Sequence, residues 1–294
     1  MESPSIVEIK MDEYLAIDAL SSGVCHTLLS QSPAHARYSQ THHHELSTAM
    51  DLGTIAHQVL LEGSEDRIAV VDAEDWRTKA AREARDLARL RGATPILEKD
   101  MGRVREMAEM AREYIAASEI AEIFKRGKPE QTMLWEENGV ACKARPDWLA
   151  DDNSVIVHFK TVGRSAEPGS FIYGTMTSMG YDIALAFYER GMRAIAGYGS
   201  PLRSMILAQE TAQPYACSLV ALSTAWMEMA SVKVERGISL WSECLHSGQW
   251  PAYSSRICYA EPRSWQLTQA AEDALGREDH AGYERMLDIA GHGS

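Results

Sequence analysis

The chain has 294 residues, of which 45% are hydrophobic, and this length can bury one large core. Its formal net charge of −13 argues against a protein that coats nucleic acid by bulk attraction, because phosphate binding depends on Lys and Arg. The first residues, MESPSIVEIK, lack a basic and an apolar signal region, and no apolar run approaches the roughly 18 residues that span a bilayer. We therefore expect a cytoplasmic protein with no membrane partner, in which DNA contact would need a local basic patch.

Helices are predicted throughout the N-terminal third of the chain. Apolar residues at helical spacing indicate a first helix over residues 45–61, which contains His57 and ends before Gly63. A second helix is predicted over residues 73–91 and a third over residues 104–117, where the same period continues.

The predicted helix over residues 73–91 has two different sides. Its apolar side consists of Trp76, Ala80, Ala84 and Leu87. Along another side, basic residues recur at intervals of three, three and four: Lys79, Arg82, Arg85 and Arg89. Such a stripe is typical of a solvated face paired with neighbouring acids, and a stripe that follows DNA phosphates is the alternative.

After Pro129 the pattern changes from helix to strand. Residues 131–137 and 140–150 flank Asn138-Gly139, a pair that accepts the positive φ angles of a two-residue turn, so a β-hairpin is predicted. A third strand follows over residues 154–161.

The remainder of the chain is predicted to mix helices with two more strands. A helix over residues 171–192 precedes strands over 203–210 and 215–222, which are joined around Gln213-Pro214. The rest is helical, with a break at residues 248–253. These elements predict an α/β fold with a central mixed sheet flanked by helices.

Polar groups converge on one patch of the predicted sheet. Alternate side chains of a strand share a face, so Ile156, His158 and Lys160 point one way while the odd-numbered apolar residues point the other. Antiparallel pairing with the preceding strand can bring Asp147 beside His158 and Lys160.

These residues resemble the paired motif of PD-(D/E)XK nucleases. Arg145-Pro146-Asp147 is followed by His158-Phe159-Lys160-Thr161, at the spacing at which those enzymes place an Asp and then an acid two residues before a Lys. Further segments are similar to the exonuclease VIII (RecE-like) and YqaJ-like phage exonucleases, and these are residues 20–38, 52–63, 76–85, 180–191, 206–216 and 248–253.

The resemblance implies roles for individual residues. Asp147 would bind Mg²⁺ or Mn²⁺, His57 would add a nitrogen ligand, and Lys160 would hold or polarise the attacking water. Glu130 is a candidate catalytic residue as a direct or outer ligand, and Tyr188 is a candidate catalytic residue in the site wall. Lys79, Arg82, Arg85 and Arg89 would follow DNA phosphates, with Arg145 as a further candidate.

Two positions depart from the family pattern. His158 stands where these nucleases carry an acidic metal ligand, and an imidazole lacks the oxygen that Mg²⁺ prefers. A site of His57, Asp147 and His158 would favour Mn²⁺ or a later transition metal, and loss of catalysis is the alternative. Ala184 replaces the glutamine that usually lies four residues before Tyr188.

The resemblance predicts a metal-dependent exodeoxyribonuclease that degrades linear double-stranded DNA from its ends in phage or prophage recombination. It also implies a homo-oligomer and a single-strand annealing protein as partner. Two alternatives stay open. One is an inactive homologue that binds DNA ends or a protein, and the other is a nuclease of RNA or branched DNA on the same fold.

The predicted domain organisation is one exonuclease-like domain followed by a tail. The domain covers residues 1–253, with N-terminal helices over 1–125, a catalytic sheet core over 126–222 and a helical closing segment over 223–253. A helical C-terminal tail covers residues 254–294.

Overall fold

The structure is a computed structural model that describes residues 3–42, 48–197 and 202–275. The chain divides into two compact units, residues 1–252 and 253–294. The first unit contains every strand of the described ranges, and the described part of the second contains one helix, α11. No helix within those ranges is long and apolar enough to cross a membrane.

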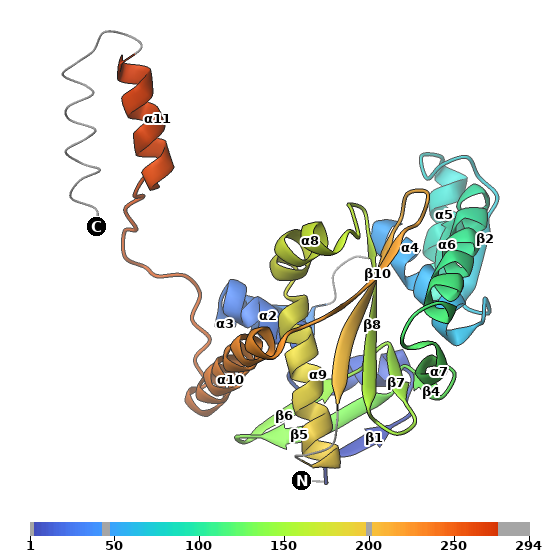
Figure 1. The fold of residues 1–294 in the computed structure, drawn as a ribbon, viewed down its shortest axis with the longest axis horizontal. Coiled ribbons are helices and arrows are strands. Elements are labelled where there is room, and N and C mark those ends of the chain that lie inside the picture. The colour runs from blue at the N-terminus through green and yellow to red at the C-terminus, as the bar shows by residue number, and fades with distance from the viewer. Residues whose placement is uncertain (1–2, 43–47, 198–201, 276–294) are drawn as a thin grey trace. The chain divides into compact units, whose positions relative to one another are not determined.

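The elements are labelled in chain order (Figure 1). The strands are β1 (Ser5–Val7), β2 (Ile68–Val71), β3 (Thr94–Leu97), β4 (Gly127–Pro129), β5 (Thr132–Glu137), β6 (Val140–Ala144), β7 (Trp148–Ala150), β8 (Val155–Val162), β9 (Arg203–Glu210) and β10 (Cys217–Ala221). The helices are α1 (Met11–Ala16), α2 (Ser22–Ser30), α3 (Pro33–Thr41), α4 (Thr48–His57), the π-helical η1 (Gln58–Glu62), α5 (Lys79–Leu90), α6 (Glu98–Ala116), α7 (Ala121–Phe124), α8 (Pro168–Ser170), the π-helical η2 (Phe171–Met176), α9 (Tyr181–Ala196), α10 (Thr224–Ser247) and α11 (Ser264–Leu275).

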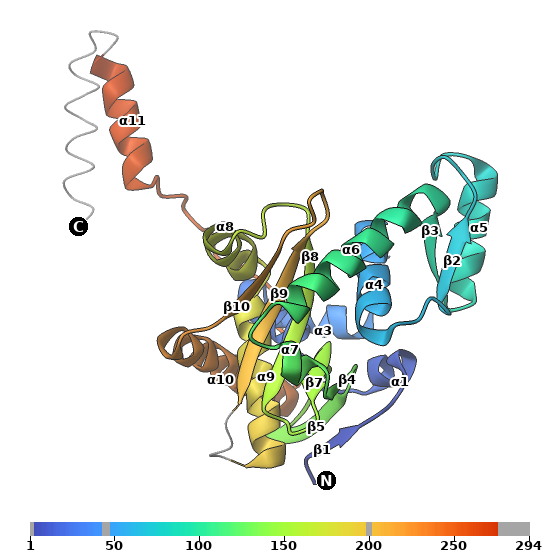
Figure 2. The same cartoon turned by 45° about the vertical axis from the view of Figure 1, so that its right-hand side comes forward.

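A mixed five-stranded sheet lies at the centre of the first unit, with the order β10-β9-β8-β7-β4. Strands β8 and β9 run parallel, and the other neighbours are antiparallel. Helices cover both faces of this sheet (Figure 2). The predicted fold class, a central mixed sheet flanked by helices, is confirmed.

Strand β8 is buried on both faces because its side chains alternate between two apolar clusters. Ile156 packs in the cluster that contains Phe187 of α9. Val155 and Val157 point the other way and pack in the cluster that contains Met107 of α6. A strand covered by helices on both sides explains why the first three residues of β8, Val155, Ile156 and Val157, are all apolar.

The predicted hairpin is confirmed, but it belongs to a different sheet from β8. Asn138 and Gly139 both have positive φ, 50° and 76°, as the two-residue turn requires. Strands β5 and β6 pair with β1 in a separate antiparallel three-stranded sheet. The prediction of one strand over residues 140–150 was wrong, since Pro146 has no backbone N–H for a ladder and the chain leaves one sheet there to enter the other at β7.

The N-terminal third is not wholly helical, because it contains β1, β2 and β3. Strands β2 and β3 pair in parallel, and they pack with α5 and α6 (Figure 2). These strands have only three or four residues, too few for an alternating pattern to be visible in the sequence.

Helix α5 differs from its prediction in both its start and its buried face. It begins at Lys79, because the Thr78 side chain accepts the N–H of Ala81 and caps the helix. Ala81 and Ala88 are its buried residues, whereas Leu87, predicted to be on the apolar side, is exposed.

Two other predicted helices change in extent or continuity. Helix α6 begins at Glu98, six residues before its predicted start. The predicted helix over residues 171–192 is interrupted at Gly180, which has a φ of 67° and forms the N-cap of α9. Of the first predicted helix, residues 45–47 lie outside the described residues, and the remainder forms α4 and η1.

Candidate functional site

Three polar residues stand in one row across the central sheet. Pro129 of β4 pairs with Trp148 of β7, and Trp148 pairs with Val157 of β8. The next position along each antiparallel pairing therefore sets Glu130 beside Asp147 and Asp147 beside His158. The Glu130 N–H donates to the Asp147 carbonyl oxygen at 3.3 Å, which continues the ladder by one step. Cross-strand neighbours share a face, so the sequence patterns of three separate segments meet here.

His57 reaches this row from the helix above it. It is the last residue of α4, at the junction with the π-helical η1, and π-helical turns occur frequently at functional sites. One turn earlier, Gly53 brings the helix close to β8, since a Cβ at this position would lie 3.1 Å from Thr161 Oγ1. The missing side chain thus lets α4 approach the strand that carries His158 and Lys160.

Asp147 is the centre of the cluster. Its Oδ1 lies 3.4 Å from His57 Nε2, while its Oδ2 lies 2.7 Å from His158 Nδ1 and 3.6 Å from Lys160 Nζ. The backbone N–H of Phe159 donates to the same Oδ2 at 2.7 Å. The predicted convergence of Asp147, His57, His158 and Lys160 is therefore present in the structure.

Glu130 completes the cluster through a second contact with His57. Glu130 Oε1 lies 3.0 Å from His57 Nε2, and Arg145 forms an ion pair with Glu130 Oε2 through Nε. Arg145 also donates from Nη1 to the Ile9 carbonyl at 2.8 Å and to Thr132 Oγ1 at 2.9 Å. Its side chain is only 10% exposed, so the structure places this predicted DNA contact among internal partners.

Tyr14 of α1 is a neighbour of the site that the sequence analysis missed. The Arg145 guanidinium lies 5.8 Å from the centre of the Tyr14 ring. Burial raises the pKa of Tyr14. No local pattern marks this residue, because more than a hundred residues separate it from Arg145 in the chain.

The ionisable groups of the cluster perturb one another strongly. Burial alone would raise the pKa of Asp147, but the charges of His158 and Lys160 hold it well below its usual range. Burial would lower the pKa of His57, but its contacts with Asp147 and Glu130 raise it to about 9. For His158 burial prevails over the attraction of Asp147, and its pKa is lowered. Strongly perturbed groups gathered at one place are a feature of functional sites.

Aromatic rings enclose His158. The rings of Tyr188 and Tyr181 stand edge-on to the imidazole, with centroids at 5.3 and 6.1 Å. Burial raises the pKa of Tyr188 well above its usual range, so its hydroxyl stays protonated. Ala184, on the same helix and also buried, adds no polar group to this wall. Tyr188 therefore packs behind His158.

The donor set fits a divalent cation. One ligand atom from each of His57, Glu130 and Asp147 lies within 4.8 Å of the others. His57 Nε2 and His158 Nδ1 are both buried, and neither makes a hydrogen bond of regular geometry. Two carboxylates and an imidazole suit Mn²⁺ and later transition metals, whereas Mg²⁺ prefers oxygen alone. Of the predicted ligands, His57 and Asp147 belong to this converging group, and Glu130 takes the third place in it.

The predicted basic stripe of α5 is divided in the structure. Lys79 and Arg85 pair with acids of their own helix. Arg89 turns inward and pairs with the buried Asp51 of α4 at 2.7 Å. Arg82 is exposed. The four cations therefore do not form one continuous exposed row.

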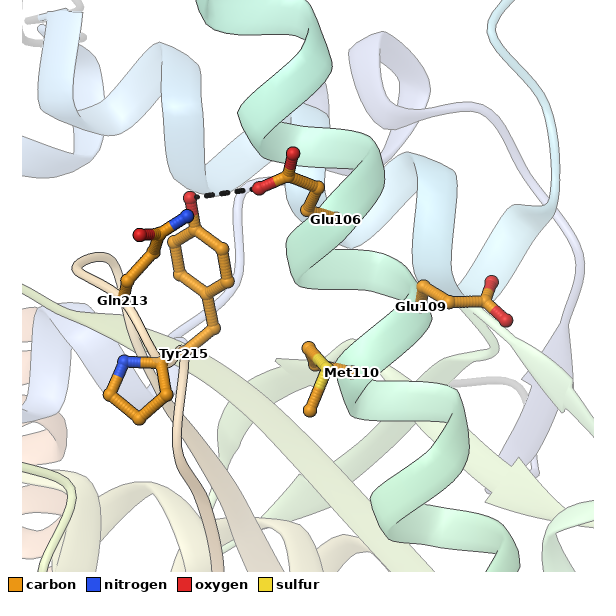
Figure 3. A pocket seen from close by; sticks show the side chains of 6 residues that line it. Glu106, Glu109, Met110, Gln213 and Tyr215 are labelled. Carbon is orange, nitrogen blue, oxygen red and sulfur yellow. Dashed lines mark hydrogen bonds between the residues drawn. The ribbon is translucent and has the colours of Figure 1, made fainter.

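A separate hollow lies between α6 and the turn that joins β9 to β10 (Figure 3). Its lining residues are Glu106, Glu109, Met110, Gln213, Pro214 and Tyr215. The Tyr215 hydroxyl donates to Glu106 Oε2 at 3.4 Å across it. None of the residues predicted for the site lines this hollow.

The fold and the cluster are those of a PDDEXK-like protein. Membership of this class indicates that the protein is a nuclease. The chain belongs to the family described as a PDDEXK-like domain of unknown function (DUF3799), whose model matches residues 22–262. No curated protein matches it.

Among solved structures, the chain is similar to one named "Putative exonuclease" from Eubacterium rectale. The two share 14% identity over 89% of this chain and 98% of the other, with a TM-score of 0.54, and this likeness shows the fold alone. A second structure, SSO0001, has 12% identity over 87% of each chain and a TM-score of 0.33, too low to support an argument.

Proposed function

We propose that this protein is a divalent-metal-dependent exodeoxyribonuclease that hydrolyses linear double-stranded DNA from its ends. The observation that carries the proposal is the position of Asp147, which lies between His57 on one side and Lys160 on the other. Metal ligands beside a cationic side chain suit phosphodiester hydrolysis, because both kinds of positive charge can neutralise charge that develops on the phosphate.

The residues of the cluster would divide the work between them. His57, Asp147 and Glu130 would hold the cation at the partly exposed edge of the sheet. A bound divalent cation neutralises charge that develops on the phosphate and makes a nucleophilic hydroxide available near neutral pH. Lys160, with its side chain 26% exposed, has an ammonium group that would hold the attacking water or a phosphate oxygen.

The finer parts of the proposal come from the resemblance of the sequence to RecE-like and YqaJ-like exonucleases. They are action in phage or prophage recombination, a homo-oligomer, a single-strand annealing partner and a place in the cytoplasm. Exposed cations on α5, such as Lys79 and Arg82, would contact the DNA backbone. A local patch is needed because the net charge is −13.

A second candidate function is that of an inactive homologue that binds DNA ends or a protein partner. The observation in its favour is His158, an imidazole in contact with Asp147 where nuclease relatives carry an acid. An imidazole supplies no negative charge to the cation, so catalysis by this chain would depend on Glu130.

A cleavage assay separates the two functions. End-labelled linear duplex DNA is incubated with Mg²⁺ or Mn²⁺ and the parent, Lys160→Ala or His158→Asp protein. Lys128→Ala, an exposed lysine on β4, is the matched control. Closed circular DNA and single-stranded RNA are tested in parallel.

We expect the parent to degrade linear DNA with Mn²⁺ and to leave circular DNA intact. Lys160→Ala should reduce the rate by at least about 100-fold, and Lys128→Ala should not. Activity that appears only in His158→Asp would establish the inactive homologue. Cleavage of circles or of RNA would replace the exodeoxyribonuclease with another nuclease on the same fold.

A further inference from the structure

The two carboxylates of the cluster are arranged alike around His57. Each has one oxygen held by protein donors and the other turned toward His57 Nε2. Glu130 Oε2 is held by Arg145, and Asp147 Oδ2 is held by the Phe159 N–H. The free oxygens, Glu130 Oε1 and Asp147 Oδ1, lie 3.0 and 3.4 Å from the same ring nitrogen. This arrangement presents two oxygens and one nitrogen to one point.

The backbone at Glu130 is unusual in a way that serves this arrangement. Its φ is 59°, in the left-handed region that side chains other than glycine rarely adopt. The residue lies between β4 and β5, where the chain passes from the central sheet to the three-stranded sheet. Strained backbone conformations persist where the surroundings hold them, and they cluster at functional sites. Here Arg145 fixes the residue by binding Glu130 Oε2, the carboxylate oxygen that does not face His57.

His158 lies on the other side of Asp147. Its Nδ1 is 2.7 Å from Oδ2, the oxygen that already accepts the Phe159 N–H. Its ring is enclosed by Tyr181 and Tyr188, and only 8% of the side chain is exposed. The ligand atoms that converge within 4.8 Å belong to His57, Glu130 and Asp147.

We propose that Glu130 supplies the second carboxylate ligand that position 158 lacks, and that His158 is a positioning residue that orients Asp147. This inference rests on the metal site of the proposed function. It assigns the site one imidazole and two carboxylates, a set that suits Mn²⁺. Partners that orient a metal ligand typically affect metal affinity by about 10–100-fold when they are removed.

Pulsed electron paramagnetic resonance of the Mn²⁺-loaded protein counts coordinated imidazoles through their nitrogen couplings, so the parent chain itself tests the assignment. We expect one imidazole, which disappears in His57→Gln and persists in His158→Asn. Two imidazoles in the parent, one of them lost in His158→Asn, would overturn the proposal. Absence of Mn²⁺ binding by the parent would overturn it as well.

Calorimetric titration of Mn²⁺ tests the two roles separately. Glu130→Gln should weaken binding more than a positioning variant does, while Glu136→Gln, an exposed acid on β5, should not change it. His158→Asn places an amide beside Asp147 Oδ2, where Nδ1 makes its 2.7 Å contact, and should retain affinity, whereas His158→Leu should lose about 10–100-fold. Thermal melting of the metal-free variants checks that they fold. Parent-like affinity in Glu130→Gln, or equal loss in His158→Asn and His158→Leu, would refute the assignment.

These measurements are independent of DNA cleavage. One imidazole with a requirement for Glu130, in a protein that cuts no DNA, would reject the proposed function and keep this inference. Cleavage by a protein with two coordinated imidazoles would do the reverse.

Discussion

Replacement of Arg145 by methionine tests whether this residue stabilises the site or contacts DNA. In the structure its guanidinium binds Glu130 Oε2, the Ile9 carbonyl and Thr132 Oγ1. Methionine retains much of the side-chain volume and removes every donor. The Glu130 carboxylate, whose side chain is 17% exposed, would then lose its cationic partner.

Removal of one partner from a buried ion pair costs about 3–5 kcal/mol. The pair has a small exposed fraction, so we take the lower end, about 3 kcal/mol. For a chain of this size such a loss lowers Tm by roughly 6–12 °C. Mn²⁺ affinity should fall as well, since Arg145 orients a proposed ligand.

Thermal denaturation and Mn²⁺ titration measure these effects. Arg105→Met is the matched control, because Arg105 also pairs with a glutamate, Glu65, but both side chains of that pair are about half exposed. Its Tm should stay close to that of the parent. The reasoning fails if Arg145→Met melts like the parent and only loses DNA affinity, with a salt dependence reduced by about one phosphate contact.

Three further results are expected. Gly180→Ala should destabilise the protein by about 1–3 kcal/mol in urea unfolding, because Gly180 has a φ of 67° and a Cβ there would lie 2.3 Å from a histidine ring. Gly102 of α6 has open space around it, so Gly102→Ala should instead stabilise the protein by about 0.5–1 kcal/mol. In the metal-free protein the pKa of His57 is raised to about 9, so the contribution of its protonated ring to folding stability is complete below pH 6.5 and is lost as the pH rises through 9. His57→Gln should flatten that part of the curve of stability against pH, and an unchanged slope would contradict this prediction. Ellman's reagent should modify the exposed Cys258 in the native protein, whereas Cys25, whose thiol pKa burial raises to about 12, should react only after unfolding.

Much of the central sheet could be predicted from the sequence because strand signals are local. The Asn138-Gly139 turn needs only two residues with positive φ, and β8 shows its polar face at His158 and Lys160 by simple alternation. The spacing from Asp147 to Lys160 likewise predicted their proximity, since one antiparallel step joins the two strands.

The limits of the prediction follow from the same locality. The segment from residue 140 to 150 was predicted to be one strand; Pro146 is a local signal for a break, but only the tertiary structure shows that the two halves belong to different sheets. The even spacing of basic residues on α5 predicted a common face, but Arg89 is drawn inward by Asp51, a partner on another helix. Periodicity describes directions around one element and carries no information about what lies opposite.

The sequence by itself placed Asp147 and Lys160 on one patch of sheet, because strand alternation and spacing constrain which side chains can meet, and its resemblance to PD-(D/E)XK nucleases added His57. The tertiary structure decided which oxygen of each carboxylate turns toward His57 and which is held by the protein. That choice depends on Arg145 reaching the Ile9 carbonyl, 136 residues away, and on a left-handed backbone at Glu130. Contacts of this kind arise only when separate segments are packed together, so no pattern within either segment encodes them.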